Sequence, residues 1–230
     1  MTAIAYENQL LGAFIYALGF EAGRNQQSVP VNLFQQTPLD SCLGDLIVGG
    51  THCVAIEFKR RRADLRSERN KWRPDLVKWL NGKPELLETS RRGHFVCFGD
   101  HGDSAVKLSF ARYFQAYNDM DKIVSIPASV AVKQLTAPLL PGKRPAWGVA
   151  GTALLSYLDA IRAFRRTEGG RSGVYSATWL TVCVTGSGYQ ILAAPSLEAL
   201  LGFSQEHEHA HARSHERTSE HEQEYDGPSL

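Results

Sequence analysis

The stretch GDLIVGGTHCVAIEFK, residues 44–59, predicts the centre of the fold because two apolar runs flank a glycine-rich turn. Residues 46–48 form the first run and residues 53–58 form the second, with Gly49 and Gly50 between them. Glycine readily adopts the positive φ angles that tight hairpin turns require. The stretch therefore predicts two antiparallel strands joined by a hairpin.

The register of this hairpin brings charged residues together. A turn centred on Thr51 pairs Asp45 with Glu57, whose Cβ atoms would then lie roughly 5 Å apart. Lys59 follows Glu57 by two residues, so it projects from the same face of the strand. Facing carboxylates repel each other unless a cation lies between them, and oxygen ligands suit Mg²⁺ or Mn²⁺. We therefore expect a divalent-cation site with a lysine that acts on water or phosphate.

A simpler interpretation is a hairpin whose charged residues merely face solvent. That interpretation explains poorly why Glu57 interrupts the apolar run of Val54, Ala55, Ile56 and Phe58. The cation site is therefore the favoured reading of this hairpin.

Asp45 followed by Glu57-Phe58-Lys59 resembles the D…(D/E)-x-K core of the PD-(D/E)XK nuclease superfamily. The flanking pattern is similar as well, with a preceding helix, a following basic helix and a further apolar strand over residues 1–100. The resemblance implies that Asp45 and Glu57 bind the metal ion and that the Phe58 carbonyl is a third ligand. Lys59 would then position or activate the attacking water.

The sequence departs from this family pattern in one respect, since no proline immediately precedes Asp45. Asp40, which lies close to Pro38, therefore stays open as a competing candidate for the aspartate. We prefer Asp45 because the hairpin register places it opposite Glu57.

Residues 3–19 predict a helix with an apolar stripe, and Glu7 falls on that stripe. An acidic residue near a helix start is also favoured by the helix dipole, so an exposed Glu7 is an equal alternative. Many members of the superfamily place a glutamate of the first helix beside the metal site. By that resemblance, Glu7 would support the metal ion directly or through water.

The segment after Lys59, RRRADLRSERNKWR at residues 60–73, carries seven positive and two negative charges. The spacing of its apolar residues predicts a helix, with Arg69 near the apolar stripe and directed toward the hairpin. A basic helix beside a carboxylate site is suited to binding phosphates, although a solvated charged face is the alternative. The candidate nucleic-acid-binding residues are Arg61, Arg62, Arg66, Arg69 and Lys71.

Charge is distributed unevenly along the 230 residues, whose formal net charge is +1. Residues 204–230 contain seven acidic residues, two arginines and five of the eight histidines, which leaves +6 on residues 1–203. This last segment lacks core residues and is predicted to be disordered. We therefore expect one nuclease-like domain at 1–203, with its core at 1–100 and additional helices and a hairpin at 101–203, followed by a tail.

The remaining elements follow from hydrophobic periodicity. The aromatic residues of the helix expected at 105–118 should pack in the core rather than stack on bases. The expected elements are a strand at 94–98, a helix at 105–118, a strand at 123–132 that Pro127 interrupts, a helix at 149–166, and a hairpin formed by 174–184 and 189–193.

No signal peptide and no apolar run of 18 residues is visible, so a cytoplasmic location without membrane insertion is expected. The predicted fold class is α/β (α+β), a central mixed sheet flanked by helices with a restriction-endonuclease-like core. The predicted function is Mg²⁺- or Mn²⁺-dependent hydrolysis of nucleic acid, with DNA preferred over RNA. Such nucleases act in phage defence and mobile elements, which suggests partner proteins or a homo-oligomer.

Two other functions stay open from the sequence. The first is a nucleic-acid-binding or partner-binding subunit with a degenerate nuclease fold. The second is an interaction protein in which the acidic residues and arginines merely pair with one another. Cleavage specificity, endonuclease or exonuclease action and the biological pathway are not determined by these patterns.

Overall fold

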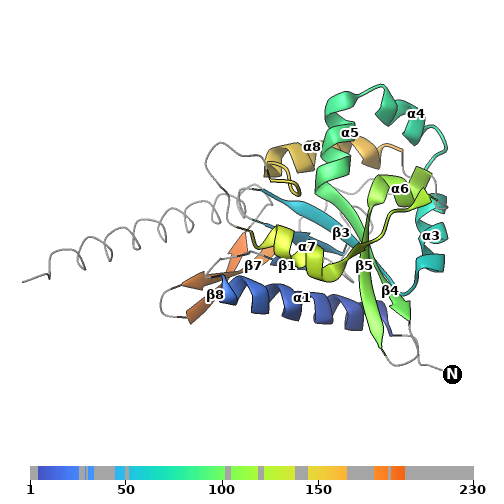
Figure 1. Ribbon diagram of the computed structural model, residues 1–230. Coiled ribbons are helices and arrows are strands. Elements are labelled where there is room, and N and C mark those ends of the chain that lie inside the picture. The colour runs from blue at the N-terminus through green and yellow to red at the C-terminus, as the bar shows by residue number, and fades with distance from the viewer. Residues whose placement is uncertain are drawn as a thin grey trace, which may run out of the picture.

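The computed structural model describes most of the chain and is shown in Figure 1. The description below concerns these residues only: 5–25, 29, 31–33, 45–49, 52–101, 105–118, 122–137, 145–164, 179–185 and 188–194. Asp40, Cys42 and the predicted tail at 204–230 lie outside the described residues.

A six-stranded mixed sheet forms the centre of the molecule, with the strands in sequence order from β1 to β6. β3 and β4 are parallel, and every other neighbouring pair in this sheet is antiparallel. This confirms the predicted central mixed sheet. The strands are β1 (Val31–Leu33), β2 (Leu46–Val48), β3 (Val54–Lys59), β4 (His94–His101), β5 (Val106–Arg112) and β6 (Ile126–Pro127).

The predicted hairpin register is confirmed for β2 and β3. Leu46 pairs with Ile56 and Val48 pairs with Val54. Gly49 has φ of 124°, and a Cβ atom there would lie 2.0 Å from the carbonyl oxygen of His52. The turn therefore needs glycine at this position, as the sequence indicates.

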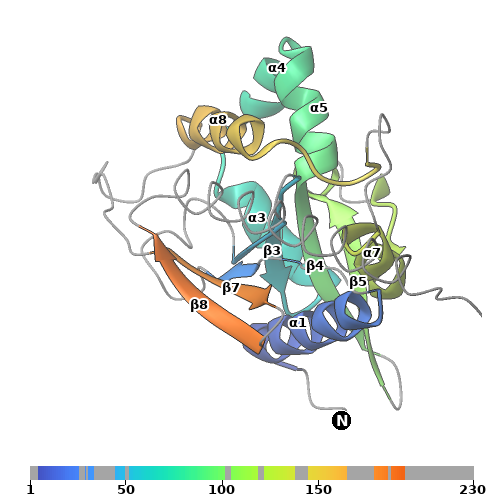
Figure 2. The same ribbon diagram turned by 90° about the vertical axis from the view of Figure 1, so that its left-hand side faces the viewer.

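Helices cover both faces of the sheet (Figures 1 and 2). α1 (Glu7–Arg24) and α7 (Ala128–Leu135) pack on one face. Figure 2 shows α1 below the sheet and α4, α5 and α8 above it. The helical segments associated with the second face are η1 (Arg62–Asp64), α3 (Leu65–Asn70), α4 (Leu76–Asn81), α5 (Pro84–Gly93), α6 (Tyr113–Asn118) and α8 (Gly151–Arg162).

Side-chain alternation along β3 divides the core between the two faces. Val54, Ile56 and Phe58 pack against α1, whereas Ala55 packs against the helices of the second face. Glu57 and Lys59 continue the side of Ala55, so the sheet itself directs both charged groups toward the second face at the end of β3. All six residues of β3 are buried.

Two predicted elements are wrong. The helix expected at 105–118 is the strand β5 followed by the short helix α6, because residues 106–112 pair along the full length of β4. The strand expected at 123–132 is mostly α7, since Pro127 ends the brief β6 pairing and lies directly before the first turn of the helix. Strand pairing overrides the local periodicity in β5, and a proline overrides it at the start of α7.

The other predicted elements are present with shifted ends. α1 continues to Arg24, five residues beyond its predicted end. The second hairpin consists of β7 (Trp179–Thr185) and β8 (Gly188–Ala194) in a separate two-stranded sheet. Within the described part of the chain, no helix is long and apolar enough to cross a membrane.

Candidate functional site

The end of β3 places Glu57 and Lys59 side by side. Lys59 Nζ donates a hydrogen bond to Glu57 Oε1 at 2.7 Å and a second one to the carbonyl of Phe58 at 3.0 Å. Both charged side chains are buried, with relative exposures of 7% for Glu57 and 10% for Lys59. Removing charged groups from water costs free energy, so buried charges are stable only when they are paired, as these two are.

α3 brings a second acid and a second lysine to the same point. Glu68 and Lys71 lie three residues apart, and Lys71 Nζ is 2.7 Å from Glu68 Oε1. Lys71 also donates to Glu57 Oε1 at 2.8 Å, and Lys59 Nζ is 3.0 Å from Glu68 Oε1. Two carboxylate oxygens and two ammonium groups thus alternate around one centre, which we call the carboxylate–lysine cluster (Glu57, Lys59, Glu68 and Lys71).

The protonation states in this cluster follow from its geometry. Burial alone would raise the pKa of Glu57, but Lys59 and Lys71 outweigh it and hold this pKa below the ordinary value. Burial would lower the pKa of Lys59, yet Glu57 and Glu68 raise it well above its ordinary value. The pKa of Lys71 is raised in the same way. Glu57 is therefore ionised and both lysines are protonated at neutral pH.

Glu68 is fixed from behind by a buried polar chain. The Tyr113 hydroxyl donates to Glu68 Oε2 at 2.6 Å, and Trp72 Nε1 donates to the same hydroxyl at 2.8 Å. The His94 ring stacks on Tyr113 with ring centroids 3.9 Å apart, and His94 Nδ1 lies 3.0 Å from the Tyr157 hydroxyl. The cluster is thereby anchored to the core of the second face.

Glu68, Tyr113 and His94 were not among the predicted site residues. A signal for Glu68 does exist, because it lies three residues after Leu65 and four before Trp72, on the apolar side of α3. The same reasoning identified Glu7. Tyr113 and His94 carry no comparable local signal, since β4 and α6 meet α3 only in the folded chain.

Asp45 lies past the last pair of the β2–β3 ladder. Its backbone N–H donates to the carbonyl of Ile56 at 3.1 Å, and its Oδ2 accepts a hydrogen bond from the N–H of Phe58 at 2.5 Å. Asp45 is buried, with 4% of its surface exposed. The carboxylate therefore lies against the backbone of β3 at Phe58, near the strand end that carries the cluster.

Glu7 occupies the first turn of α1 at the edge of the same region. Its Oε1 lies 4.0 Å from Lys59 Nζ, and its side chain is 36% exposed. Burial raises the pKa of Glu7, while Lys59 acts in the opposite sense. Glu7 therefore lies at a helix start and near Lys59, and its predicted support of a metal ion stays a prediction.

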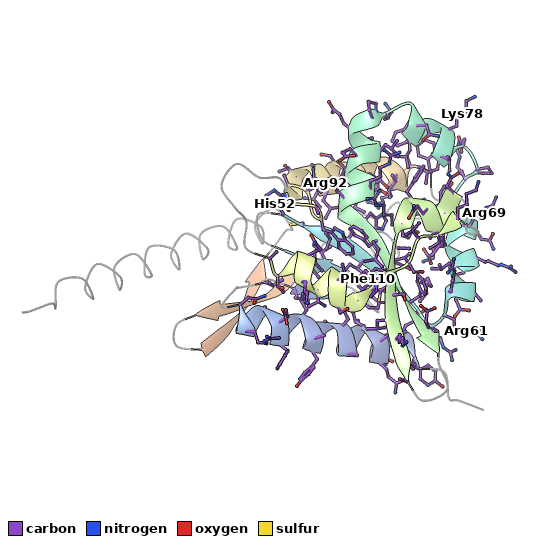
Figure 3. The ribbon with its side chains drawn as sticks, in the orientation of Figure 1. His52, Arg61, Arg69, Lys78, Arg92 and Phe110 are labelled. Carbon is purple, nitrogen blue, oxygen red and sulfur yellow. The ribbon has the colours of Figure 1, made fainter. Side chains whose placement is uncertain are left out.

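The predicted nucleic-acid-binding arginines form an exposed surface, which we call the arginine face (Arg61, Arg62, Arg66 and Arg69). Figure 3 shows Arg61 and Arg69 directed outward beside η1 and α3, so the expectation that Arg69 points toward the hairpin is wrong. Arg61 pairs with Asp64 at 3.2 Å, and Arg62 donates to the carbonyl of Ile123 at 3.3 Å. Lys71, predicted with them, lies in the carboxylate–lysine cluster.

The donor set suits a hard divalent cation in its chemistry. Glu57 is ionised, Asp45 is a second buried carboxylate at the same strand end, and Glu7 is a third at the edge. The Phe58 carbonyl, expected as a ligand, accepts from Lys59 here. Across the described residues, no group of three or more His, Cys, Asp or Glu side chains is arranged as metal ligands would be. Lys59 and Lys71 both contact Glu57 through the same oxygen, Oε1.

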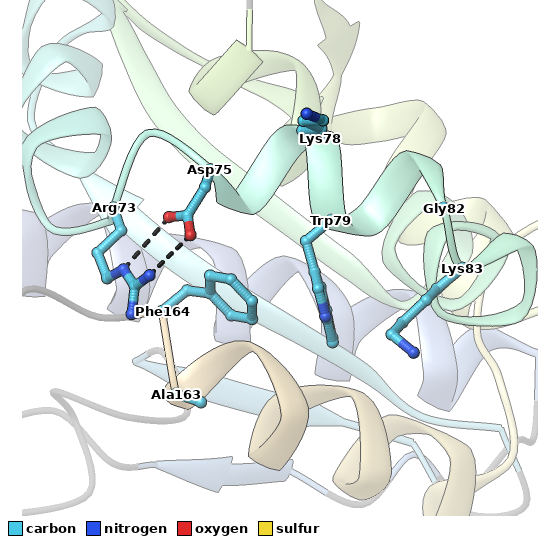
Figure 4. A pocket seen from close by; sticks show the side chains of 8 residues that line it. All are labelled: Arg73, Asp75, Lys78, Trp79, Gly82, Lys83, Ala163 and Phe164. Carbon is cyan, nitrogen blue, oxygen red and sulfur yellow. Dashed lines mark hydrogen bonds and ion pairs between the residues drawn. The ribbon is translucent and has the colours of Figure 1, made fainter.

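A groove of about 610 Å³ lies elsewhere, between α4 and the end of α8 (Figure 4). Trp79 and Phe164 meet there with ring centroids 4.6 Å apart. Lys83 lies over the Trp79 ring and Arg73 lies over the Phe164 ring, at 5.3 Å and 5.4 Å. Each ring already contacts a cation and the other ring, so these contacts hold α8 against α4.

Comparison with known proteins adds no assignment, because no protein family, curated protein or solved structure matches the chain.

Proposed function

We propose that the protein is a metal-dependent nuclease that hydrolyses phosphodiester bonds of DNA at the end of β3. The observation that carries this proposal is the buried, ionised pair of Glu57 and Lys59, two residues apart at the end of a central strand. A fold gains little stability from burying such charges, because desolvation offsets most of their attraction. Charged groups kept in this way are typical of functional sites.

The chain topology supports the resemblance to the PD-(D/E)XK superfamily. α1 is followed by the antiparallel strands β1, β2 and β3, and a helical crossover then leads to β4, which is parallel to β3. This order agrees with the helix, hairpin, basic helix and strand on which the resemblance rests. The candidate motif lies at the end of the parallel strand, where ligands of open α/β sheets bind.

In this proposal Asp45, Glu57 and the Phe58 carbonyl hold Mg²⁺ or Mn²⁺, and Glu7 supports the ion at the edge. When bound, the ion would polarise the phosphate and acidify a water molecule. The water oxygen would bond to phosphorus and give up a proton to solvent, one ester P–O bond would break, and the leaving oxygen would take a proton from solvent. Lys59 is protonated at neutral pH, so we assign it to orienting the water and stabilising phosphate charge rather than to removing a proton.

The arginine face would bind the nucleic-acid backbone next to this site. Arg66 and Arg69 are exposed on α3, the helix that also carries Glu68 and is directly followed by Lys71. Phosphate contacts of this kind position the duplex without reading its sequence. The proposal therefore predicts binding that is weakly sequence-specific and strongly salt-dependent. A place in phage defence or a mobile element is part of the same proposal.

A second function is favoured by one specific observation. Glu57 and Glu68 already neutralise both lysines, so the cluster is stable without an added cation. A nucleic-acid-binding subunit with a degenerate nuclease fold would have this property. It would bind DNA through the arginine face and leave the phosphodiester bonds intact.

One experiment separates the two functions. The purified chain is incubated with linear and circular duplex DNA in Mg²⁺ or Mn²⁺, with EDTA as the control, and binding is followed by gel shift over a salt series. The nuclease proposal predicts salt-sensitive binding and metal-dependent cleavage. Salt-sensitive binding without cleavage under any metal ion supports the second function. Absence of both would contradict the two functions together.

A further inference from the structure

We propose that the exposed side of α1 binds a second copy of this chain, with the two α1 helices antiparallel. Figures 1 and 2 show α1 along the lower edge of the described molecule, with no labelled helix or strand beneath it. The residues of this surface, which we call the outer α1 face, are Gly12, Ala13, Tyr16, Gly19, Phe20 and Gly23. The inference does not depend on the proposed nuclease function.

α1 is apolar on two opposite sides. Leu10, Phe14 and Leu18 are buried against the sheet. On the other side, Tyr16 has 77% of its surface exposed and Phe20 has 60%. A helix that is apolar on all sides is normally buried on all sides, and a continuous exposed apolar patch is typical of an interaction site. The described residues of the chain cover only one of the two sides.

The outer α1 face carries no charge. Its residues all lie within about 60° of Tyr16 around the helix axis. The charged residues of α1 have other contacts, since Glu7 lies 4.0 Å from Lys59 and Glu21 pairs with Arg24 at 3.4 Å. Nucleic acids and anionic membranes are bound through basic side chains, which this face lacks. Its complement is therefore another uncharged, apolar surface.

A second outer α1 face has the required shape. When two copies of α1 meet antiparallel about a two-fold axis at Tyr16, Phe20 of one copy lies at the level of Gly12 of the other, and Ala13 lies at the level of Gly19. A Cβ atom added at Gly12 or Gly19 would have no other part of the structure within 4 Å. Each large side chain therefore meets open space above small residues of the other copy. The antiparallel arrangement also places opposite ends of the two helix dipoles side by side.

The available area predicts a weak, reversible dimer. An aromatic side chain contributes about 150–250 Å², so Tyr16 and Phe20 together would bury about 550 Å² over the two copies. Stable interfaces bury at least about 1,200 Å² in total, whereas transient ones are smaller. We therefore expect association that depends on protein concentration.

Sedimentation velocity of the full chain without metal ions or DNA tests this inference. Between about 5 µM and about 500 µM, the range of weak protein association, the mean mass should rise toward twice that of the single chain. Tyr16→Arg combined with Phe20→Arg should keep the single-chain mass throughout, because two copies would then bring like charges together. Val106→Arg with Val124→Arg is the matched control, since these valines are 41% and 64% exposed outside α1, and it should associate like wild type.

Gly12→Leu distinguishes the packed helix pair from general apolar adhesion. Leucine favours the helix and has open space at this position, so the variant should fold, as circular dichroism can establish. It enlarges the apolar surface but fills the space that Phe20 of the second copy would occupy. We therefore expect association at least about tenfold weaker than wild type, whereas adhesion without a defined register would become stronger.

Three results would overturn the inference. The first is a single-chain mass for wild type at every concentration, and binding of that single chain to uncharged phospholipid vesicles would then assign the outer α1 face to a membrane surface. The second is association that the double arginine variant on α1 leaves unchanged. The third is stronger association of Gly12→Leu. None of these measurements involves DNA cleavage, so their failure leaves the proposed function untouched.

Discussion

Glu57 is the residue on which the proposed chemistry depends. It is buried, ionised and shared by two lysines, one from its own strand and one from the end of α3. Pairs of this kind rarely raise stability over an apolar core of equal volume. The stability of the fold alone therefore does not explain the cluster, and our proposal assigns it a chemical role.

His94 gives a residue-scale prediction about pH. Burial lowers the pKa of His94 to about 3, whereas histidine in an unfolded chain titrates near 6.5. Below about pH 6.5 the unfolded state binds a proton that the folded state does not, so this residue makes the free energy of unfolding fall as pH falls, by about 1.4 kcal/mol per unit.

His94→Gln should remove this part of the pH dependence, because glutamine does not titrate and still offers an acceptor to Tyr157. Urea unfolding of wild type and variant between pH 4.5 and pH 7 measures the difference. Equal pH slopes for the two proteins would show that His94 is protonated in the folded state and that its buried environment has been misjudged.

The sequence predicted the strand residues of the site better than the helix residues. Glu57 and Lys59 share a face because side chains in a strand alternate, which needs no knowledge of the rest of the fold. Glu68 joins them only because η1 and α3 turn back over the end of β3. That contact depends on how the crossover packs, which local spacing does not encode.

At the scale of elements, α3 connects the carboxylate–lysine cluster with the arginine face. Its buried side supplies Glu68 and leads into Lys71, and its outer side exposes Arg66 and Arg69. Among the described residues, no ion pair involves either of these two arginines. They are thus the members of the arginine face best placed to bind phosphates.

Arg66→Gln combined with Arg69→Gln should weaken DNA binding equally across sequences. Two lost phosphate contacts would reduce the slope of log K against log salt by about 1.8. Fluorescence anisotropy over a salt series measures the slope. Arg24→Gln with Lys133→Gln is the charge-matched control on α1 and α7, and an equal effect from both double variants would show that only net charge matters.

The errors in the predicted elements have a common cause. Residues 106–112 contain apolar residues that fit a helix as well as a strand, and pairing with β4 decides between them. The second error concerns α7. Its segment contains β-branched residues that favour a strand, but Pro127 directly precedes the first turn of the helix. Local propensity is weak where a long-range partner or a proline is present.

At the scale of the whole molecule, the sheet keeps two separate cores. Phe14 on α1 contacts Phe58 and Phe110 on one face, with ring centroids 5.9 Å and 5.1 Å apart. The other face carries the cluster and its buried support from Tyr113 and His94. The cluster and the α1 core therefore lie on opposite faces of the sheet.

The tail gives the whole-molecule prediction. Residues 204–230 have too little apolar surface to offset the entropy of ordering them. Deleting them should change the melting temperature by less than about 4 °C, a shift of about 1 kcal/mol for a domain of this size. Scanning calorimetry measures it, and a larger decrease would mean that this segment packs on the domain.

The most direct test of the central claim is the rate of Mg²⁺-dependent cleavage of circular DNA by Glu57→Gln. Glutamine keeps the shape of the side chain and removes the charge that would bind the ion, so the rate should fall at least about 100-fold. Glu85→Gln, an exposed acid in the first turn of α5, is the matched control and should cleave like wild type, and urea unfolding establishes that both variants are folded. Near wild-type cleavage by folded Glu57→Gln would contradict the account.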